Sequence, residues 1–536
     1  MSLRAPSAGT SLHRVSAALI ATALASCTAY GTRPESPAHG GRAWAEANSQ
    51  HFRVIADLPA DEAAAMALEL EQALDAIDQV AFEHARTSLE PTTVVVFSEG
   101  SDFHAFAPEL IEGRFYRKLP GDLEPSRFML LHGTLSTESR IACLHELTHD
   151  LFERNFGPAP AWLNEGWAQY YSTIQIEPDR LRVGAALPQL TFTAESEPFS
   201  ARADDGSIVL AMPIESVATP SQLLRLGRDE FYRASAVEHP SDADRMRATS
   251  LYLGSWALVH MLHDGPEPYP TRFNRFLQNV RRERVETAWQ SAFAGVGSGD
   301  FDRDFKHYLA LRQLAVFEFG KRNATNAPSI ATRELTDAEV HVLWARLSPW
   351  EGAQGAAAKR DLDEAVTEAP SSAEAHYFRG LYWAAQHRFD AAADDLLAAA
   401  RLAPNDPRYL LGILTLRAQQ QPPTEHVHAG DPVMQAAEPL GQVARSPLQF
   451  QALARVYYDL GDLQQALAYA ERGVALAPID SFNLDAEAQI LNALGRTQEA
   501  VDHERSAVAF LPEGIAAPQL AKRLSEYEAR LQAAPR

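Results

Sequence analysis

The chain has 536 residues, of which 46% are hydrophobic and 22% are charged. This length exceeds what one hydrophobic core fills, so we expect two to four folded domains. The net charge of −22 at pH 7 argues against a nucleic-acid partner, because phosphate contacts need surfaces rich in Lys and Arg. With only two cysteines, the chain has no disulfide framework.

The first 26 residues have the pattern of an export signal. Arg4 and Arg14 precede an apolar stretch at 15–25 that has signal-peptide length and is too short to span a membrane. The segment 1–26 ends in Leu-Ala-Ser before Cys27, which resembles a bacterial lipobox. The resemblance implies a lipid on Cys27 and anchoring at the bacterial cell envelope, on the periplasmic side of the outer membrane. The alternative is an ordinary signal peptide and a secreted protein.

The next part of the chain is predicted to be a tether followed by alternating strands and helices. Residues 27–47 are rich in Pro, Gly, Ser and Ala, as flexible tethers are. A strand is expected at 51–55 and a helix, with apolar residues on one face, at 61–86. The β-branched run at 92–97 predicts a buried strand, and 126–133 predicts another.

A metal-binding pattern follows at 145–149, where the chain has His-Glu-Leu-Thr-His. At 3.6 residues per turn, His145 and His149 lie on one face of a helix, so both imidazoles can bind one Zn²⁺. Glu146 then lies beside the metal, where it can act as a general base. The alternative is an exposed pair of histidines without a metal.

A third ligand is available in the segment Trp-Leu-Asn-Glu-Gly at 162–166. Catalytic zinc typically takes two histidines and a glutamate and keeps a fourth position for water. Two prolines at 157–160 break the first helix, so a second helix over 161–173 can run back alongside it. We therefore expect Glu165 to be the third zinc ligand.

These two helices together resemble the gluzincin zinc metallopeptidases, and their compact arrangement resembles the bacterial peptidase-MA-like domains. The resemblance implies an α+β zincin-like domain at 48–325 with a mainly helical second half. It also implies that Glu146 takes a proton from a zinc-bound water that attacks a peptide bond. A donor on a later helix should stabilise the oxyanion, and Tyr252 is the candidate.

Two departures from the family limit what the resemblance implies. The Gly-x-Met-Glu-Asn type segment with which aminopeptidases hold the substrate amino terminus does not stand upstream of His145, so aminopeptidase activity is not expected. The thermolysin-like gluzincins have an Asp four residues after the glutamate ligand to orient a histidine, whereas this chain has Gln169. Gln169 and Asp150 are the candidates for that role.

The second half of this domain is expected to be helical. Residues 185–245 are polar and carry no pattern that we could assign, after a hairpin arm at 180–184. Helices are then predicted at 248–264 and, in the remainder, at 271–281, 284–294 and 301–318.

Residues 335–536 have a different pattern, with alanine-rich helices and prolines at a fixed interval. Pro370 and Pro404 are 34 residues apart, as are Pro478 and Pro512, which resembles the period of tetratricopeptide repeats. The resemblance implies an all-α solenoid of stacked helix pairs whose concave surface binds a protein partner. The alternative is an unrelated helical bundle.

Taken together, these patterns imply a zinc-dependent peptidase of the bacterial cell envelope that acts on a peptide or protein substrate, with repeats that recruit a partner or the substrate. The alternative is a non-catalytic envelope scaffold that uses the repeats, with the peptidase-like domain as a relic or a metal-binding module. The intact set of two histidines and two glutamates favours catalysis, because a relic is free to lose any of them.

Overall fold

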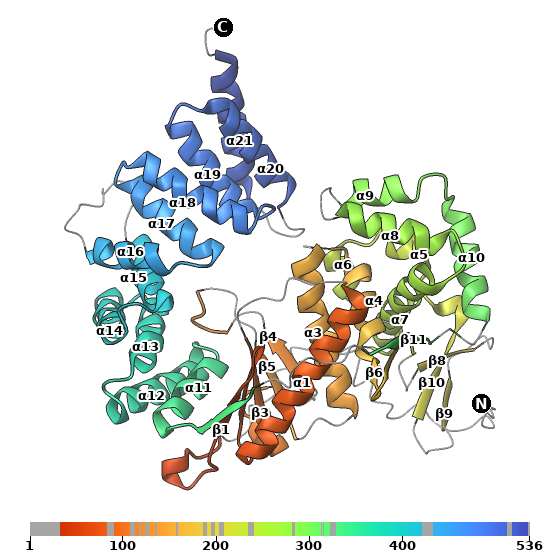
Figure 1. Cartoon of the computed structure of the whole chain (residues 1–536), viewed down its shortest axis with the longest axis horizontal. Coiled ribbons are helices and arrows are strands. Elements are labelled where there is room, and N and C mark those ends of the chain that lie inside the picture. The colour runs from red at the N-terminus through yellow and green to blue at the C-terminus, as the bar shows by residue number, and fades with distance from the viewer. Residues whose placement is uncertain are drawn as a thin grey trace. The chain divides into compact units, whose positions relative to one another are not determined.

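The computed structural model shows two compact units, which are described separately (Figure 1). The first unit includes Ala43–Phe115 and Arg127–Glu334, and the second includes Glu35–Arg42, Tyr116–Ser126 and Leu335–Arg536. The residues that the structure describes are 33–82, 91–107, 113–116, 119–123, 128–133, 137–156, 159–185, 190–193, 199–202, 208–233, 241–280, 285–311, 314, 316–321, 329–420, 432–511 and 517–533.

Among the described residues, five strands from the first half of the first unit and one strand from its end form a six-stranded sheet. Its central strands β2, β3 and β5 run parallel, and β1 is antiparallel to both of its neighbours. The strand predicted at 92–97 is confirmed as β3, and all six of its residues are buried, as its β-branched run indicates. In spatial order the strands are β12 (Ala331–Glu334), β1 (Ala45–Asn48), β2 (Phe52–Ala56), β3 (Thr92–Phe97), β5 (Phe128–His132) and β4 (Gly113–Tyr116).

Helix α1 (Ala60–Ala81) packs on this sheet against β1 and β2, and the short helix α2 (Gly100–His104) follows β3. Figure 1 shows α1 beside the sheet. The buried face of α1 consists of residues at helical spacing, among them Met66, Leu70 and Ile77. Helix α3 (Thr137–Phe156), which contains the metal-binding pattern, shares one hydrophobic core with this face and with the sheet. The metal-binding pattern therefore lies on a helix that is fixed by packing.

The predicted tether at 27–47 is wrong at its carboxyl end. Residues Pro37–His39 form a single 3₁₀ turn, η1, and β1 begins at Ala45. β1 is a four-residue strand that is paired on one side with β12, a partner from the far end of the unit. Such a short strand is stabilised by long-range pairing, which composition does not reveal.

The helical core of the first unit is built around α3 (Thr137–Phe156), α4 (Ala161–Ser172) and α7 (Asp242–Asp264), and α4 packs against both of the others. A Cβ atom at Gly166 of α4 would lie 2.3 Å from the carbonyl oxygen of Ser255 in α7, so the close approach requires glycine. Further helices of this core are α8 (Tyr269–Val280), α9 (Val285–Ala292) and α10 (Ser298–Ala310).

The prediction of a helix over 301–318 is wrong at its end, because Phe317–Gly320 forms strand β11. β11 pairs with β7 (Arg180–Val183), which also pairs with β6 (Gln175–Ile176). The apolar side chains of Phe317 and Phe319 alternate with Glu318, and both phenylalanines pack on the core. This period of two favours a strand over a helix.

Residues 185–245 also contain more regular structure than their sequence indicates. Three strands form a second small sheet, and short helices follow. Among the described residues, the second half of the first unit is therefore mainly helical, as expected, and two small sheets accompany the helices. These elements are β8 (Leu190–Thr193), β9 (Phe199–Arg202), β10 (Ile208–Pro213), η2 (Ile214–Ser216), α5 (Pro220–Leu223) and α6 (Arg228–Tyr232).

In the described residues, the second unit contains five consecutive helix pairs and a final helix, as the 34-residue period predicts. Within a pair, the helices pack closely: a Cβ atom at Gly380 would lie 2.9 Å from Leu396 Cγ. Pro512 and residues 421–431 lie outside the described residues. The pairs are α11 (Asp337–Leu347) with α12 (Gly352–Glu368), α13 (Ala373–Ala385) with α14 (Phe389–Leu402), α15 (Pro407–Gln420) with α16 (Pro432–Val443), α17 (Pro447–Asp459) with α18 (Leu463–Leu476), and α19 (Ser481–Ala493) with α20 (Thr497–Ala509), and the last helix is α21 (Pro518–Ala533).

The second unit also includes two segments from the first half of the chain, so the expected domain at 48–325 is not continuous. Asp122 pairs with Arg346 of α11 at 2.9 Å, and both side chains are buried. Gly121 has a φ of 83°, and a Cβ atom there would lie 2.1 Å from the Trp350 ring. These contacts join residues that are far apart in the sequence, and no local pattern predicts them.

Candidate metal centre

The predicted ligands come from α3 and α4, which pack against each other. His145 and His149 lie on α3, one turn apart, and His149 is buried. Glu165 lies on α4, all of whose residues are buried. The chain leaves α3 and re-enters a helix at Ala161, directly after Pro160, which starts α4 and directs it back along α3.

The three side chains converge on one point. His145 Nε2 lies 3.0 Å from His149 Nε2, and the Glu165 Oε2 atom lies 3.3 Å from the first and 3.6 Å from the second. Three ligand atoms bound to zinc at about 2.0–2.1 Å with tetrahedral angles lie about 3.3 Å apart. The observed separations therefore suit a zinc ion with two histidines and a carboxylate.

The carboxylate of Glu165 and the two histidines stabilise opposite charges on one another. Burial lowers the pKa of His149, but the charge and hydrogen bond of Glu165 outweigh burial and raise this pKa to about 9. Burial in turn raises the pKa of Glu165, but the two histidines hold it well below the usual range. Glu165 is therefore ionised, and a positive charge is favoured where the histidines face it.

Asn164 orients His149. Its Oδ1 atom lies 2.9 Å from His149 Nδ1 and can only accept, so Nδ1 carries a proton and Nε2 is the nitrogen that faces His145 and Glu165. We expected Gln169 or Asp150 in this role. Gln169 is buried further along α4, and the side chain of Asp150 lies outside the described residues. The signal that we missed is a buried polar residue directly before the glutamate ligand.

Tyr232, at the end of α6, is a site residue that the sequence did not reveal. Its hydroxyl donates a hydrogen bond of 2.7 Å to Glu165 Oε1, while Oε2 faces the histidines. Burial, assisted by the charge of Glu165, raises the pKa of Tyr232 far above its ordinary value, so the hydroxyl remains a donor. The segment around Tyr232 has no motif, and only its position in the fold identifies it.

The two residues expected to act in catalysis have different surroundings. Glu146 is half-buried on α3 beside His145, and its charge contributes to the raised pKa of His149. Tyr252 is buried on α7, and its ring packs edge-on against Phe231 with the centroids 5.4 Å apart. The hydroxyl of Tyr232, in the neighbouring element, donates to Glu165.

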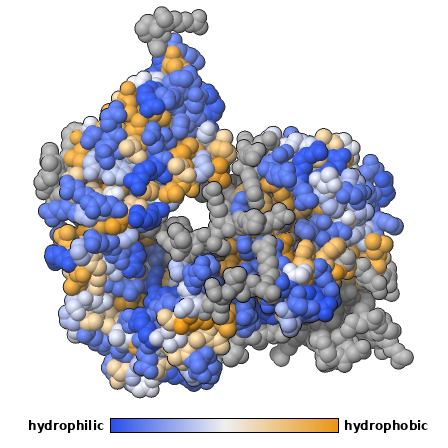
Figure 2. Space-filling model, in the orientation of Figure 1, coloured by the Kyte–Doolittle hydropathy of each residue, from blue (hydrophilic) through white to orange (hydrophobic). Residues whose placement is uncertain are grey.

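The repeat unit has a groove lined by the first helices of three consecutive pairs, α15, α17 and α19. Its volume is about 490 Å³. Phe482 of α19 lines it and is 41% exposed, and Arg455 pairs with Asp459 at its wall. Figure 2 shows hydrophobic side chains at the surface of this part of the repeats, among hydrophilic ones.

No helix in the described part of the chain is both long and apolar enough to span a membrane. The export segment 1–26 and Cys27 lie outside the described residues.

Tetratricopeptide-repeat proteins are among the solved structures to which this chain is similar. No family model matches the sequence, and no curated protein matches it. A tetratricopeptide-repeat protein of Thermus thermophilus is 18% identical, covering 36% of this chain and 97% of its own, with a TM-score of 0.26. PilF of Pseudomonas aeruginosa is 17% identical, covering 37% and 90%, with a TM-score of 0.29. A tetratricopeptide repeat protein of Parabacteroides merdae is 15% identical, covering 53% and 93%, with a TM-score of 0.25.

Proposed function

We propose that this protein is a zinc-dependent peptidase in which His145, His149 and Glu165 hold the metal. The observation that carries the proposal is the convergence of their three ligand atoms within 3.0–3.6 Å of one another. When bound there, Zn²⁺ would supply Lewis acidity and a water whose pKa is lowered to about 7. A glutamate beside the first histidine completes the set of groups that peptide hydrolysis needs.

The protein's own residues have distinct roles in this proposal. Glu146 accepts the proton of the attacking water and passes it to the leaving amine, because a carboxylate beside the ligands is a base within reach of both. Asn164 holds His149 in the tautomer that binds metal, and Tyr232 holds Glu165. Tyr252 remains the predicted oxyanion donor from the sequence.

The test separates the base from the ligands. Glu146→Gln in the full-length protein should abolish cleavage of casein or of a peptide library and keep its zinc, whereas Glu165→Gln should lose one equivalent of zinc. Glu177→Gln, at a half-buried position in the same unit, is the control and should change neither. If Glu146→Gln lost zinc as readily as Glu165→Gln, the assignment of the base would be wrong.

The repeats are proposed to bind a protein partner or to recruit the substrate through the groove of α15, α17 and α19. A second candidate function follows from the same groove: an envelope scaffold in which the repeats alone carry the function. The two candidates differ in cells that lack the native protein. If the protein is a peptidase, the Glu146→Gln variant should not restore the function that these cells have lost. If the protein is a scaffold, the Glu146→Gln variant should restore that function fully, and the Phe482→Ala variant should not.

Anchoring at the cell envelope through Cys27 is part of the same proposal. Cys27→Ser should abolish labelling with a palmitate analogue and release the protein from the membrane fraction. A secreted protein with an ordinary signal peptide would show no labelling in the wild type.

A further inference from the structure

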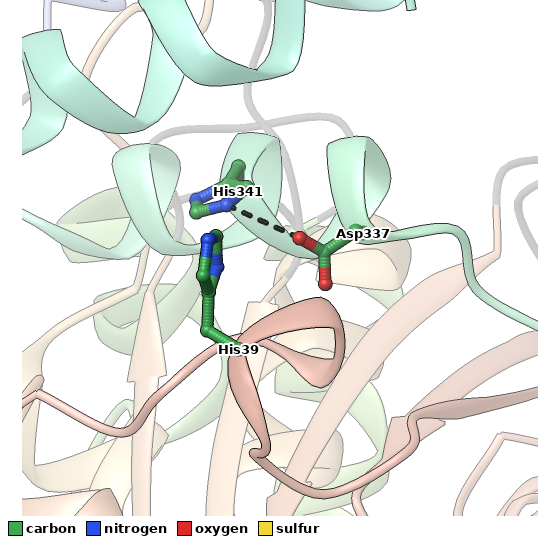
Figure 3. A group of neighbouring side chains, drawn as sticks. All are labelled: His39, Asp337 and His341. Atoms are coloured by element: carbon green, nitrogen blue, oxygen red, sulfur yellow. Dashed lines mark ion pairs between the residues drawn. The ribbon is translucent and has the colours of Figure 1, made fainter. Parts of the chain in front are cut away.

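A second group of metal-binding side chains lies within the second unit. His39 comes from η1, and Asp337 and His341 lie one turn apart on α11. One ligand atom from each residue lies within 4.8 Å of the other two. Figure 3 shows the ring of His39 extending toward His341, with Asp337 beside them. The antiparallel pairing of β1 with β12 places the segment before β1 beside the segment after β12.

His341 presents an open nitrogen to this group. The residue is only 3% exposed, and its Nδ1 lies 3.3 Å from Asp361 Oδ1, which can only accept. Nε2 has no hydrogen-bond partner among the described residues, and it faces oxygens of Glu364 at 3.3 Å, Asp337 at 3.5 Å and Glu368 at 4.0 Å. A buried lone pair that faces three carboxylates is satisfied by a proton or by a metal cation.

His39 also donates through Nδ1 and keeps the lone pair on Nε2. Its Nδ1 lies 2.8 Å from Ser36 Oγ, and that hydroxyl donates to Asp337 Oδ2 at 2.9 Å. Ser36 therefore accepts from Nδ1, which leaves the lone pair on Nε2 of His39. The backbone N–H of Ala38 donates to Asp337 Oδ1 at 2.8 Å, so the carboxylate is held in place and keeps lone pairs for a further ligand. Both imidazoles are thus in the tautomer that binds metal through Nε2.

The next repeat has a histidine in a similar arrangement, but its Nε2 atom has a hydrogen-bond partner. His376 of α13 pairs through Nδ1 with Asp395 of α14 at 2.7 Å, just as His341 pairs with Asp361 of α12. Its Nε2, however, lies 3.1 Å from the carbonyl oxygen of Pro370 and can donate to it. Both nitrogens of His376 are therefore used, and the open nitrogen at His341 is not a general consequence of a helix pair.

We propose that His39, Asp337 and His341 bind a divalent transition-metal ion and that Glu364 is the candidate fourth ligand. Two imidazoles with carboxylates suit Zn²⁺ and its neighbours in the first transition row, whereas Ca²⁺ and Mg²⁺ prefer oxygen ligands alone. A closed site of this kind is structural. It fastens the segment Glu35–Arg42 to the first helix of the repeats.

The test counts zinc in the full-length protein by equilibrium dialysis. Glu165→Gln serves as the background because it removes the proposed catalytic zinc, and in it one equivalent should remain. Adding His341→Gln or His39→Gln should weaken the binding of this zinc ion at least tenfold. His39 is exposed, so His39→Gln tests the site without changing a buried residue. Adding His376→Gln is the matched control and should leave it unchanged.

A second measurement follows the segment itself. Zn²⁺ should slow hydrogen exchange at 35–42 in the Glu165→Gln background and should have no such effect once His341→Gln is added. If Glu165→Gln binds no zinc and shows no such slowing, His341 holds a proton among the carboxylates and the metal site does not exist. That result would leave the proposed peptidase untouched, because the catalytic zinc is measured in the wild type.

Discussion

Two polar residues outside the predicted ligand set determine how the ligands are presented. Asn164 orients His149, and the hydroxyl of Tyr232 holds Glu165. Residues that orient metal ligands typically contribute tenfold to a hundredfold to metal affinity. The affinity of the site should therefore depend on a tyrosine that no motif marks.

We predict that Tyr232→Phe weakens zinc binding about tenfold or more and leaves the protein folded, because only one hydroxyl is removed. Competition with a chromophoric chelator measures the affinity. Tyr252→Phe is the matched variant, from the adjacent helix, and should bind zinc as the wild type does. If Tyr252 donates to the oxyanion, this variant should lower kcat about 10²-fold or more. Equal zinc affinity in Tyr232→Phe and wild type would contradict the orienting role of Tyr232.

Backbone conformation at the turns of the repeats provides a second residue-scale prediction. Gly461 and Gly495 have φ values of 82° and 78° between the helices of their pairs, and His387 has a φ of 57° at the same turn of another pair. A residue with a Cβ atom loses about 1 kcal/mol or more in this region, and glycine does not. His387→Gly should therefore stabilise the repeats by about 0.5–1 kcal/mol. The free energy lost with the contact between the His387 and Phe389 rings reduces this gain.

Denaturant unfolding monitored by circular dichroism measures this gain. The reciprocal control is Gly461→Ala, which introduces the strain at the equivalent turn and should destabilise the repeats by a similar amount. A stabilising Gly461→Ala would show that the turn conformation is not what limits stability there.

At the scale of an element, α20 contains a glutamate that folding places out of water. Glu504 is fully buried, and burial, with the nearby charge of Asp485, raises its pKa above the ordinary value of 4.5 although Arg523 opposes the shift. The folded protein therefore binds this proton more tightly than the unfolded chain. The stability from Glu504 is complete below about pH 4.5 and is lost as the pH rises through the raised pKa.

We predict that Glu504→Gln raises the melting temperature of the repeats at pH 8 and has a smaller effect at pH 5, because glutamine stays neutral at both. The free energy of unfolding changes by at most about 1.4 kcal/mol per pH unit for one proton, so the variant should reduce the pH dependence by no more than this amount. Glu499→Gln, at an exposed position on the same helix, is the control. A pH dependence that is unchanged in Glu504→Gln would show that the carboxyl of Glu504 is ionised in the folded protein.

At the scale of the whole molecule, the first unit extends beyond its expected end at 325 to the end of β12, and the second unit resumes at Leu335. Glu46 of β1 is a buried carboxylate that pairs with Arg333 of β12 and with Arg53 of β2. A chain that ends at 325 lacks β12, so β1 becomes an edge strand and Glu46 loses one of its two cations. A hydrogen bond to a charged group is worth about 1.5–3 kcal/mol.

We therefore predict that a fragment of residues 43–334 melts at a higher temperature than a fragment of residues 43–325. Both keep α3 and α4, so both should retain zinc at His145, His149 and Glu165. Thermal unfolding and zinc content of the two purified fragments are the measurements. Identical melting would mean that β12 belongs functionally to the repeats that follow it.

Local chemistry was sufficient to predict several features of this protein. Histidines one turn apart on α3 share a face because of the helical period, and the buried strand β3 follows from its β-branched run. The repeats follow from a 34-residue period, because each helix pair packs mainly on its neighbours. In each case the interacting residues are close in the sequence or repeat at a fixed interval.

Only the tertiary structure revealed contacts between distant segments. Tyr232 reaches Glu165 from α6, and the segment Glu35–Arg42 joins the second unit, where His39 meets His341. The strand β11 replaces the end of a predicted helix because β7 offers it a partner. Such contacts depend on where the chain returns after long intervals, and the energies that select them come from burial and pairing with partners that no local window of sequence contains.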